Sequence, residues 1–403
     1  MPADKPACDP ALWLLDETIT YLNHGSFGAC PRAVLDFQAA IRERIERQPM
    51  QFFVRDLEPL LDDARHELAR FLSATPENLV FVPNATAGVN TVLRSLEFER
   101  EDELLVTNYE YNASRNALDF VAARAGARVV VAKIPFPLQS PDQIVEAVMG
   151  AVTEKTRLAL FDHVTSQTGV IFPVKRLVDL LSEHGIDALI DGAHAPGMLP
   201  LSLDALGAAY YTGNCHKWLC GPKTAAFLYI RPDLQPAVRP LIISHGANSP
   251  RSDRSKLQIE FGWTGTGDPS ACLSVPEAIR SIAGLVPGGW PAVMRHNHEL
   301  ALAGRELLCK TLGIGRPCPD EMIGSLASIP LPATLATAEY KAPLYLDPLQ
   351  DALLEKHQIE VPVIRWASSW RLLRISAQLY NSMPQYIRLA SVLSEELFSQ
   401  NAK

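Results

Sequence analysis

The sequence predicts an α/β protein with a mostly parallel central sheet covered by helices on both sides, followed by a smaller α+β C-terminal domain. Short apolar runs of strand length alternate with segments of helix length through most of the chain, and strands joined in this way pair in parallel. With 403 residues and 47% hydrophobic composition, the chain is large enough for two domains. A proline-rich stretch at 317–332 precedes strands that belong to the second domain.

Each element has its own signal in the order of the chain. Apolar, β-branched runs predict strands in the main domain at Leu79–Val82, Glu103–Thr107, Arg128–Ala132, Leu158–His163, Ala188–Ile190, Ala208–Tyr211 and Ala225–Ile230. Helical spacing or an opening proline predicts helices at Pro31–Arg47, Leu57–Leu72, Val89–Leu96, Asp142–Val152, Val174–His184 and Glu299–Leu312. Further strands are expected at Ser325–Leu331, Val361–Trp366 and Trp370–Ser376. We therefore expect residues 21–288 to form the large domain, and residues 1–20 and 289–403 the small one.

Composition argues against several classes of function. The net charge of -8 disfavours a nucleic-acid surface, and no apolar run approaches the roughly 18 residues that a membrane span needs. The polar, proline-bearing segment Met1–Asp9 lacks the apolar centre of a signal peptide, so we expect a cytoplasmic protein. Seven irregularly spaced cysteines indicate reduced thiols. Cys215, His216 and Cys220 lack a second paired motif, so no metal site is expected.

Lys217 is the candidate reactive residue. It lies in the run Gly213-Asn214-Cys215-His216-Lys217-Trp218-Leu219-Cys220-Gly221-Pro222-Lys223, on a turn between two predicted strands. An amine held beside an indole ring loses charge through desolvation and becomes a nucleophile toward an aldehyde. The alternative is a surface lysine beside a buried tryptophan.

The strand Leu79–Val82 runs into the small-residue turn Pro83-Asn84-Ala85-Thr86-Ala87-Gly88, after which a helix is expected. A helix N-terminus in this position presents free backbone N–H groups and a positive dipole end to an anion. The pattern predicts a phosphate cradle to which Thr86 adds a hydroxyl. Thr86 is equally well explained as a helix N-cap.

Other notable side chains follow strands and should meet at the same edge of the sheet, where ligands bind in α/β folds. They include Tyr111, Ser166, Asp191 and His194. Asp191 ends an apolar strand, so its carboxylate needs a cationic or hydrogen-bonding partner, such as a protonated pyridine nitrogen, unless it caps a helix. The ring of Tyr111 either stacks on a flat cofactor or simply packs.

Three further segments complete the candidates. Tyr21-Leu22-Asn23-His24-Gly25-Ser26-Phe27-Gly28 is a turn whose glycines allow close backbone approach, in a ligand pocket or merely a tight turn. Arg55 follows Phe52 and Phe53 and either reaches an anionic group or is solvated. Arg374 and Ser376 share one face of a strand. The glycine-rich run 261–269 lacks the dinucleotide spacing, which disfavours a dehydrogenase.

Taken together, these motifs resemble the class V aminotransferase family of fold-type I pyridoxal-phosphate enzymes. The Tyr21–Gly28 run and the lysine run are most similar to the branch of isopenicillin N epimerase and its relatives. The resemblance covers nearly the whole chain, from about Tyr21 to the final helix. It implies pyridoxal 5'-phosphate as cofactor and an amino acid as substrate.

The resemblance also implies roles for individual residues. Lys217 would carry the cofactor as a Schiff base and shuttle protons, Asp191 would pair with the pyridine nitrogen, His194 would approach the phenolic oxygen, and Tyr111 would stack on the ring. The further cofactor contacts implied are Ala85, Thr86, Ser166, Asn214, His216 and Thr266, with Thr266 crossing from the partner subunit of a homodimer. Arg374 would clamp the substrate α-carboxylate, with Asn23, His24 and Arg55 as the other substrate-binding candidates.

Several reactions remain open after removal of the Cα proton. An epimerase or racemase is the first expectation, with His24 or Tyr111 as the acid on the far face. A carbon–sulfur β-lyase, an aminotransferase and a binding or regulatory module that only keeps the fold are the alternatives. A cysteine desulfurase is disfavoured, because Val361–Trp370 contains no cysteine.

Overall fold

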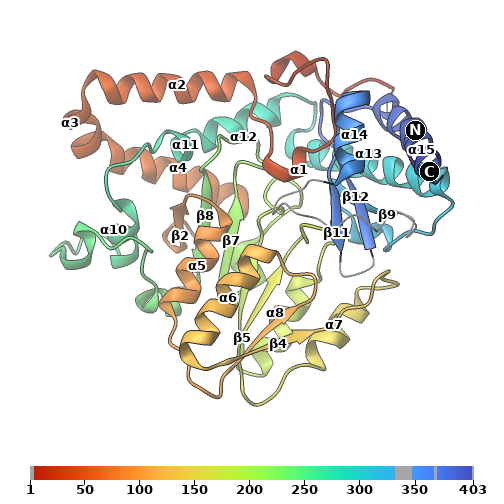
Figure 1. The fold of residues 1–403 in the computed structure, drawn as a ribbon. Coiled ribbons are helices and arrows are strands. Elements are labelled where there is room, and N and C mark those ends of the chain that lie inside the picture. Colours follow the sequence, from red (N-terminus) through yellow and green to blue (C-terminus); the bar gives the residue numbers. More distant parts are fainter. Residues whose placement is uncertain (1–3, 332–346, 367–369, 402–403) are drawn as a thin grey trace.

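The computed structural model describes residues 4–331, 347–366 and 370–401 (Figure 1). The ends of the predicted small domain, the end of the proline-rich stretch and part of the segment before Trp370 lie outside these described residues. Within them, no helix combines the length and apolar character needed to cross a lipid bilayer.

The main sheet has seven strands in the order β2-β8-β7-β6-β5-β3-β4. Their bounds are β2 Leu79–Val82, β3 Glu103–Thr107, β4 Arg128–Ala132, β5 Thr156–Asp162, β6 Asp187–Asp191, β7 Tyr210–Asn214 and β8 Ala226–Ile230. The strands β4, β3, β5, β6 and β7 pair in parallel, whereas β8 is antiparallel to both its neighbours. The predicted mostly parallel sheet is therefore confirmed.

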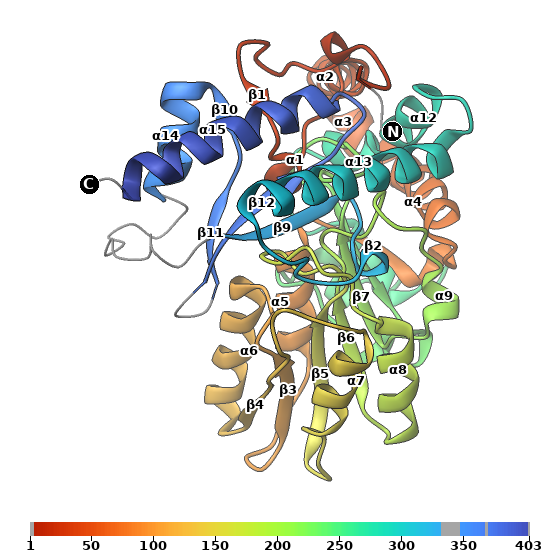
Figure 2. The ribbon, with the colours of Figure 1, turned by 90° about the vertical axis from the view of Figure 1, so that its right-hand side faces the viewer.

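Helices cover both faces of this sheet. In Figure 2, α5 (Ala85–Ser95) and α6 (Asn112–Ala125) lie on one side, and α7 (Asp142–Met149) and α8 (Val174–Glu183) lie on the other. The strand β5 shows how the sequence builds the two layers. Leu158 and Leu160 enter one apolar cluster, whereas Ala159 and Phe161 enter the other, because successive side chains of a strand point to opposite faces.

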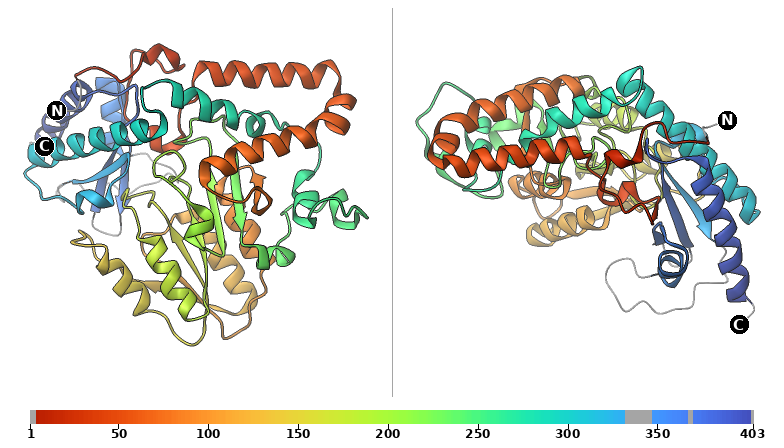
Figure 3. Two further views of the ribbon diagram at one scale, coloured as in Figure 1. Left: turned by 180° about the vertical axis from the view of Figure 1, so that it is seen from behind. Right: turned by 90° about the horizontal axis from the view of Figure 1, so that it is seen from above.

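A helical layer lies beside the sheet. It contains α1 (His24–Phe27), α2 (Arg32–Arg47), α3 (Pro49–Gln51), a π-helical turn (Phe52–Asp56), α4 (Leu57–Leu72), α11 (Ser270–Leu273) and α12 (Val275–Gly284). Outside this layer, α9 (Leu203–Leu206) packs against α8, and α10 (Lys256–Gly262) packs against β2. Figure 3 shows α2 and α4 joined at one end through α3, and α11 and α12 pack against both. Short 3-10 turns occupy Pro10–Leu12, Pro76–Asn78, Pro232–Ala237, His245–Asn248 and Asp320–Met322.

The smaller sheet is antiparallel, in the order β11-β12-β9, with β9 Leu326–Leu331, β11 Val363–Trp366 and β12 Trp370–Ser376. The helices α13 (Gly289–Leu312) and α15 (Met383–Asn401) pack together, and α13 also contacts β9 and β12. The strand β1 (Thr20–Tyr21) pairs with β10 (Ile359–Glu360), which follows α14 (Pro348–His357). We propose, on these contacts, that residues 1–20 belong with residues 289–403.

Two predicted helix starts are wrong. The helix α5 begins at Ala85 instead of Val89, because the Asn84 side chain accepts a hydrogen bond from the Ala87 amide and caps it. The helix α13 begins at Gly289 instead of Glu299, after Gly288 in the left-handed conformation. In both cases small or helix-breaking residues stand within the first turn, where they are tolerated.

Candidate active site

A cavity of about 140 Å³ opens where β2, β5, β6 and β7 end. Its lining residues are Ser26, Phe27, Asn84, Ala85, Thr86, Tyr111, Asp162, Val164, Ser166, Asp191, Ala193, His194, Asn214, His216 and Lys217. Every predicted cofactor contact except Thr266 is among them. The polar side chains that follow the predicted strands thus lie together at the carboxyl ends of those strands.

Lys217 stands on the loop that follows β7, and its amine is the centre of the cavity's chemistry. Burial lowers the pKa of Lys217 to about 7, and the positive charge of Arg374 acts in the same direction. The negative charges of Asp191 and Asp162 oppose this shift. Near neutral pH a large share of the amine is therefore uncharged, as a nucleophile or a base requires.

His194 presents a hydrogen-bond donor to the Lys217 amine. The Trp218 indole N–H donates to Nδ1 of His194 over 3.3 Å, so a neutral His194 carries its proton on Nε2. Nε2 lies 3.0 Å from Nζ of Lys217. Burial and the charge of Lys217 hold the pKa of His194 well below its ordinary value, so the ring is neutral. Trp218 thereby turns a His194 N–H toward Lys217.

Asp191 ends β6 and is buried with donors of its own. The Ser114 hydroxyl donates to Oδ2 over 2.7 Å, and the Ala193 amide donates to Oδ1 over 3.1 Å. Burial raises the pKa of Asp191, whereas these two hydrogen bonds and Lys217 act to lower it. The bond from Ala193 closes a local turn, and no helix follows, so the N-cap interpretation of Asp191 does not hold.

The phosphate cradle predicted after β2 has the geometry of an anion site. Asn214 Oδ1 accepts the Ala85 amide over 2.9 Å, which ties the first turn of α5 to the end of β7. Gly88 is required for this approach, because a Cβ there would lie 2.1 Å from Oγ1 of Thr212. Nδ1 of His216 is buried without a hydrogen-bonding partner. A buried imidazole nitrogen without a partner, lining the same cavity as the N-terminus of α5, fits a phosphate group.

Arg374, on β12, reaches the cavity through two serines. Its guanidinium donates to the Ser26 hydroxyl over 2.8 Å and to the carbonyl and hydroxyl of Ser166. Ser376, two residues along the strand, accepts the Gly25 amide over 3.0 Å. The predicted common face of Arg374 and Ser376 is confirmed, because both side chains contact the 25–26 segment.

His24 and Asn23 are near the cavity without lining it. His24 is fully buried; its Nε2 lies 3.0 Å from the Lys217 carbonyl oxygen, and its Nδ1 lies 2.8 Å from the Tyr380 hydroxyl. Since the carbonyl only accepts, Nε2 donates and the hydroxyl donates to Nδ1. Asn23 Oδ1 accepts from Ser26 over 2.5 Å, and its amide donates to Glu360. Both side chains are thus placed to hold loops rather than to touch a ligand.

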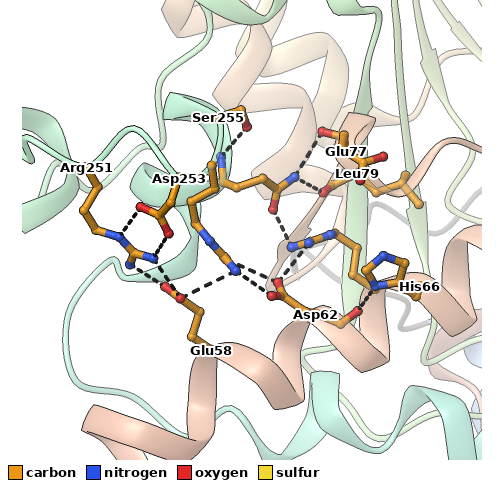
Figure 4. A network of polar contacts seen from close by, with 11 residues as sticks. Glu58, Asp62, His66, Glu77, Leu79, Arg251, Asp253 and Ser255 are labelled. Atoms are coloured by element: carbon orange, nitrogen blue, oxygen red, sulfur yellow. Dashed lines mark hydrogen bonds and ion pairs between the residues drawn. The ribbon is translucent and has the colours of Figure 1, made fainter.

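Two predicted residues lie elsewhere in this chain. Thr266 is exposed on the loop after α10. Arg55 is exposed in the π-helical turn and lines a separate cavity of about 410 Å³ between α4 and the segment 245–263. Figure 4 shows the polar network along that cavity, in which Arg251 donates hydrogen bonds both to Asp253 and to Glu58 on α4. One subunit alone does not bring Arg55 or Thr266 to Lys217.

Sequence reasoning missed four residues of the site. Asp162 and Ser26 line the cavity, and Glu110 and Ser114 lie directly behind it. Asp162 follows the apolar run Leu158–Phe161 in the way that Asp191 follows its own run, so the same pattern could have identified it. The pairing of Ser26 with Arg374 has no local signal, since 348 positions separate them.

The chain fits pyridoxal 5'-phosphate on the chemistry of its donors. The α5 N-terminus, Thr86 and His216 would hold the phosphate, and Asp191 would face the pyridine nitrogen. Lys217 offers a partly neutral amine for the aldehyde, with a His194 N–H beside it.

Comparison with known proteins agrees with this geometry. The family model described as Aminotransferase class-V matches residues 43–382. The chain is 36% identical over 395 residues to isopenicillin N epimerase of Amycolatopsis lactamdurans, covering 94% of this chain and 96% of the relative. It is 31% identical over 405 residues to a probable chloroplastic L-cysteine desulfhydrase of Arabidopsis thaliana, covering 94% and 83%.

Among solved structures, a cystine C-S lyase in complex with its product cysteine persulfide superposes with a TM-score of 0.78 at 20% identity, covering 94% of this chain and 97% of that one. This likeness concerns the fold and confirms the fold-type I architecture. The family match over most of the chain, together with the relatives above 30% identity, confirms the expected membership and cofactor. The chain belongs to the class V aminotransferase family of pyridoxal-phosphate enzymes.

Proposed function

We propose that this protein removes the Cα proton of an amino acid with Lys217 and then eliminates a sulfur-bearing group from the β-carbon. The observation that carries the first step is the Lys217 amine, which is partly neutral near pH 7 and within 3.0 Å of His194. Bound pyridoxal phosphate supplies the electron sink for the negative charge left at Cα.

The other residues position the substrate. Arg374 would bind the α-carboxylate, because a guanidinium forms two parallel hydrogen bonds with it. Ser26 and Ser166 hold that guanidinium from two sides. After proton removal, Lys217 would carry the proton and could deliver it to the departing sulfur, which leaves as a thiol or sulfide.

Elimination is favoured over epimerisation by the position of His24. Epimerisation needs a second proton donor on the face opposite Lys217, and His24 is buried behind the lysine loop with both ring nitrogens engaged. Elimination needs no such donor. The relatives named L-cysteine desulfhydrase support the same choice.

Epimerisation is the second candidate. Tyr111 lines the cavity and could act as the far-face acid, and two isopenicillin N epimerases are 36% and 33% identical to this chain. Aminotransfer is not favoured by any contact in the described residues.

We also propose a homodimer in which Thr266 of one subunit reaches the phosphate site of the other. Thr266 is exposed on its loop, and Leu241, Ile242 and Ile243 expose 43%, 62% and 60% of their surfaces. A run of exposed apolar side chains of this kind is typical of a subunit interface.

Light scattering of the purified protein tests the oligomeric state. A Lys217→Ala subunit mixed with a Thr266→Ala subunit would show whether the sites are shared.

One experiment separates the two reactions. The purified enzyme with pyridoxal phosphate is incubated in deuterated water with L-cysteine and, separately, with a panel of amino acids lacking a β-leaving group. Sulfide and pyruvate from cysteine would support elimination. Inverted, deuterated amino acid without loss of the β-substituent would support epimerisation instead. Absence of both, and of Cα exchange, would contradict the proposal.

A further inference from the structure

Three carboxyl groups meet behind the cavity, each at the end of one of three neighbouring strands. Glu110 follows β3, Asp162 ends β5 and Asp191 ends β6, and Asp162 and Asp191 are register partners. One carboxyl oxygen of each residue lies within 4.8 Å of the other two. Their exposed fractions are 7%, 3% and 2%. Three full negative charges at this separation, away from water, would repel strongly.

The hydrogen-bond donors are unequally shared among the three. Asp191 accepts from the Ser114 hydroxyl and the Ala193 amide. Both oxygens of Glu110 and Oδ2 of Asp162 are buried without a hydrogen-bonding partner. Donors stabilise the charged form of a carboxyl group, and their absence favours the protonated form. The geometry therefore assigns the negative charge to Asp191 and a proton to Glu110.

The surrounding groups support this assignment. Lys217 faces Asp191 and Asp162, and its positive charge acts to lower the pKa of Asp191. The Tyr211 hydroxyl, near Asp191, is hydrogen-bonded to His163 over 2.9 Å. Burial, followed by the charges of Asp162 and Asp191, raises the pKa of Glu110 well above its ordinary value, and the Tyr111 backbone N–H opposes this shift only weakly. Burial and the charge of Asp191 also raise the pKa of Asp162, against smaller opposing effects of Glu110 and of the Ser166 and Tyr111 backbone N–H groups.

We propose that Glu110 remains protonated at neutral pH and donates its O–H to Asp162, so that the three groups hold at least one proton and Asp191 keeps its charge. Glu110 is then a positioning residue for Asp191, because it reduces the repulsion that would otherwise drive a proton onto Asp191. This inference rests on the role proposed for Asp191 toward the pyridine nitrogen.

The test compares Glu110→Gln, which keeps a donor and cannot ionise, with Glu110→Ala, which removes the donor. The wild-type folded state holds a proton on Glu110 that the unfolded chain loses above about pH 4.3. Folded stability therefore falls as pH rises from that value toward the raised pKa in the folded state. Glu110→Gln should abolish this fall in stability, because a glutamine at this position does not ionise.

The expected result is measured first on the apoprotein. The Tm of Glu110→Gln should equal that of the wild type near about pH 5 and exceed it by a few degrees near about pH 8. The wild type should show the infrared band of a protonated carboxylic acid, and Glu110→Gln should lack it. A wild type that is more stable than Glu110→Gln at the higher pH, or the absence of that band, would overturn the proposal.

Two further measurements separate the possible failures. Glu110→Gln should bind pyridoxal phosphate about as well as the wild type, whereas Glu110→Ala should bind it roughly fivefold to tenfold more weakly. A wild-type Tm that rises with Mg²⁺ or Ca²⁺ while that of Glu110→Gln does not would mean that a cation balances the cluster, and the proposal would fail. Asp191→Ala could bind the cofactor as well as the wild type while the Tm difference between the wild type and Glu110→Gln still grows with pH. That outcome would refute the role proposed for Asp191 toward the pyridine nitrogen and leave the protonation of Glu110 supported.

Discussion

The candidate active-site cavity and the network between α4 and the segment 249–258 are both rich in charge, but they balance it differently. In the network, Glu58 and Asp62 each accept hydrogen bonds from arginine side chains, and every side chain of these pairs keeps between 22% and 47% of its surface exposed (Figure 4). In and behind the cavity, Lys217, Asp191 and Glu110 are largely removed from water, and burial shifts the pKa of each group toward its neutral form. The comparison indicates that paired, partly exposed charges hold side chains in place but contribute little to the free energy of folding. Buried ionisable groups without a full set of partners instead have shifted pKa values, and a shifted pKa is what makes a group such as the Lys217 amine reactive near neutral pH.

The largest expected effect comes from deleting the cavity's amine. Lys217→Ala should lower kcat by at least about a thousandfold, because it removes the base that takes the Cα proton. Lys175→Ala is the matched control, since Lys175 is exposed and paired with Asp179 on α8. The measurement is the rate of product formation by the two variants, and Lys175→Ala should keep the wild-type rate. A Lys217→Ala enzyme with more than about a tenth of wild-type kcat would refute the role of the lysine as base.

The second prediction concerns the protonation state of that amine. With a pKa of about 7, Lys217 of the apoprotein is mostly charged below neutrality. The rate at which the apoprotein takes up pyridoxal phosphate, followed by absorbance, should therefore rise roughly tenfold per pH unit below that value and level off above it. Arg374→Gln should move the midpoint to higher pH, because its positive charge helps to lower the lysine pKa. A midpoint that Arg374→Gln leaves unchanged would contradict the electrostatic account.

The fold was largely predictable from local patterns. The strands Leu79–Val82 and Glu103–Thr107 and the helix Leu57–Leu72 have the bounds that their apolar periodicity indicated. Asp191 and Lys217 could also be placed, because Asp191 ends one buried strand and Lys217 stands on the loop after the next. The helix α5 was placed too late, since the sequence gives no means of knowing that Asn84 is its N-cap rather than a turn residue.

The remaining parts of the site depend on contacts between distant segments. The tautomer of His194 is set by Trp218, which stands on the loop after β7, and the neighbours of Glu110 are set by the register of β5 and β6. The sequence also suggested that His24 touches the substrate. Its position behind Lys217 follows from the contact with Tyr380, 356 positions away. No local pattern encodes such a contact.

The third prediction tests this hydrogen-bonded chain from Tyr380 through His24 to the Lys217 carbonyl. Tyr380→Phe leaves Nδ1 of His24 buried without its donor, so the free energy of unfolding should fall by about 1–3 kcal/mol. Because the lysine loop loses its fixed position, kcat should also fall roughly fivefold to tenfold at little change in KM. Tyr386→Phe is the control, since its hydroxyl donates to the Ser376 carbonyl and not toward Lys217.

Both tyrosine variants should lose stability, but only Tyr380→Phe should lower kcat. Urea unfolding and steady-state kinetics on the two proteins give the answer. Equal losses of kcat would mean that the effect is a general consequence of weakened packing, and the positioning role of His24 would be withdrawn.

The smallest effects are expected in the network. Arg251 contacts Glu58 and Asp253, and its side chain is 41% exposed, so Arg251→Ala should lower the free energy of unfolding by at most about 1 kcal/mol. Arg254, paired with Asp62 at 22% exposure on both sides, should have the larger effect of the two, because it is less screened by water. Urea unfolding at low and high salt distinguishes them. The Arg251 effect should largely disappear at high salt, where exposed charges are screened, and that of Arg254 should persist in part. Both variants could instead lower the free energy of unfolding as much as Tyr380→Phe does, at every salt concentration. The exposed ion pairs would then contribute as much stability as the buried hydrogen bond, and the energetic contrast between the two regions would be refuted.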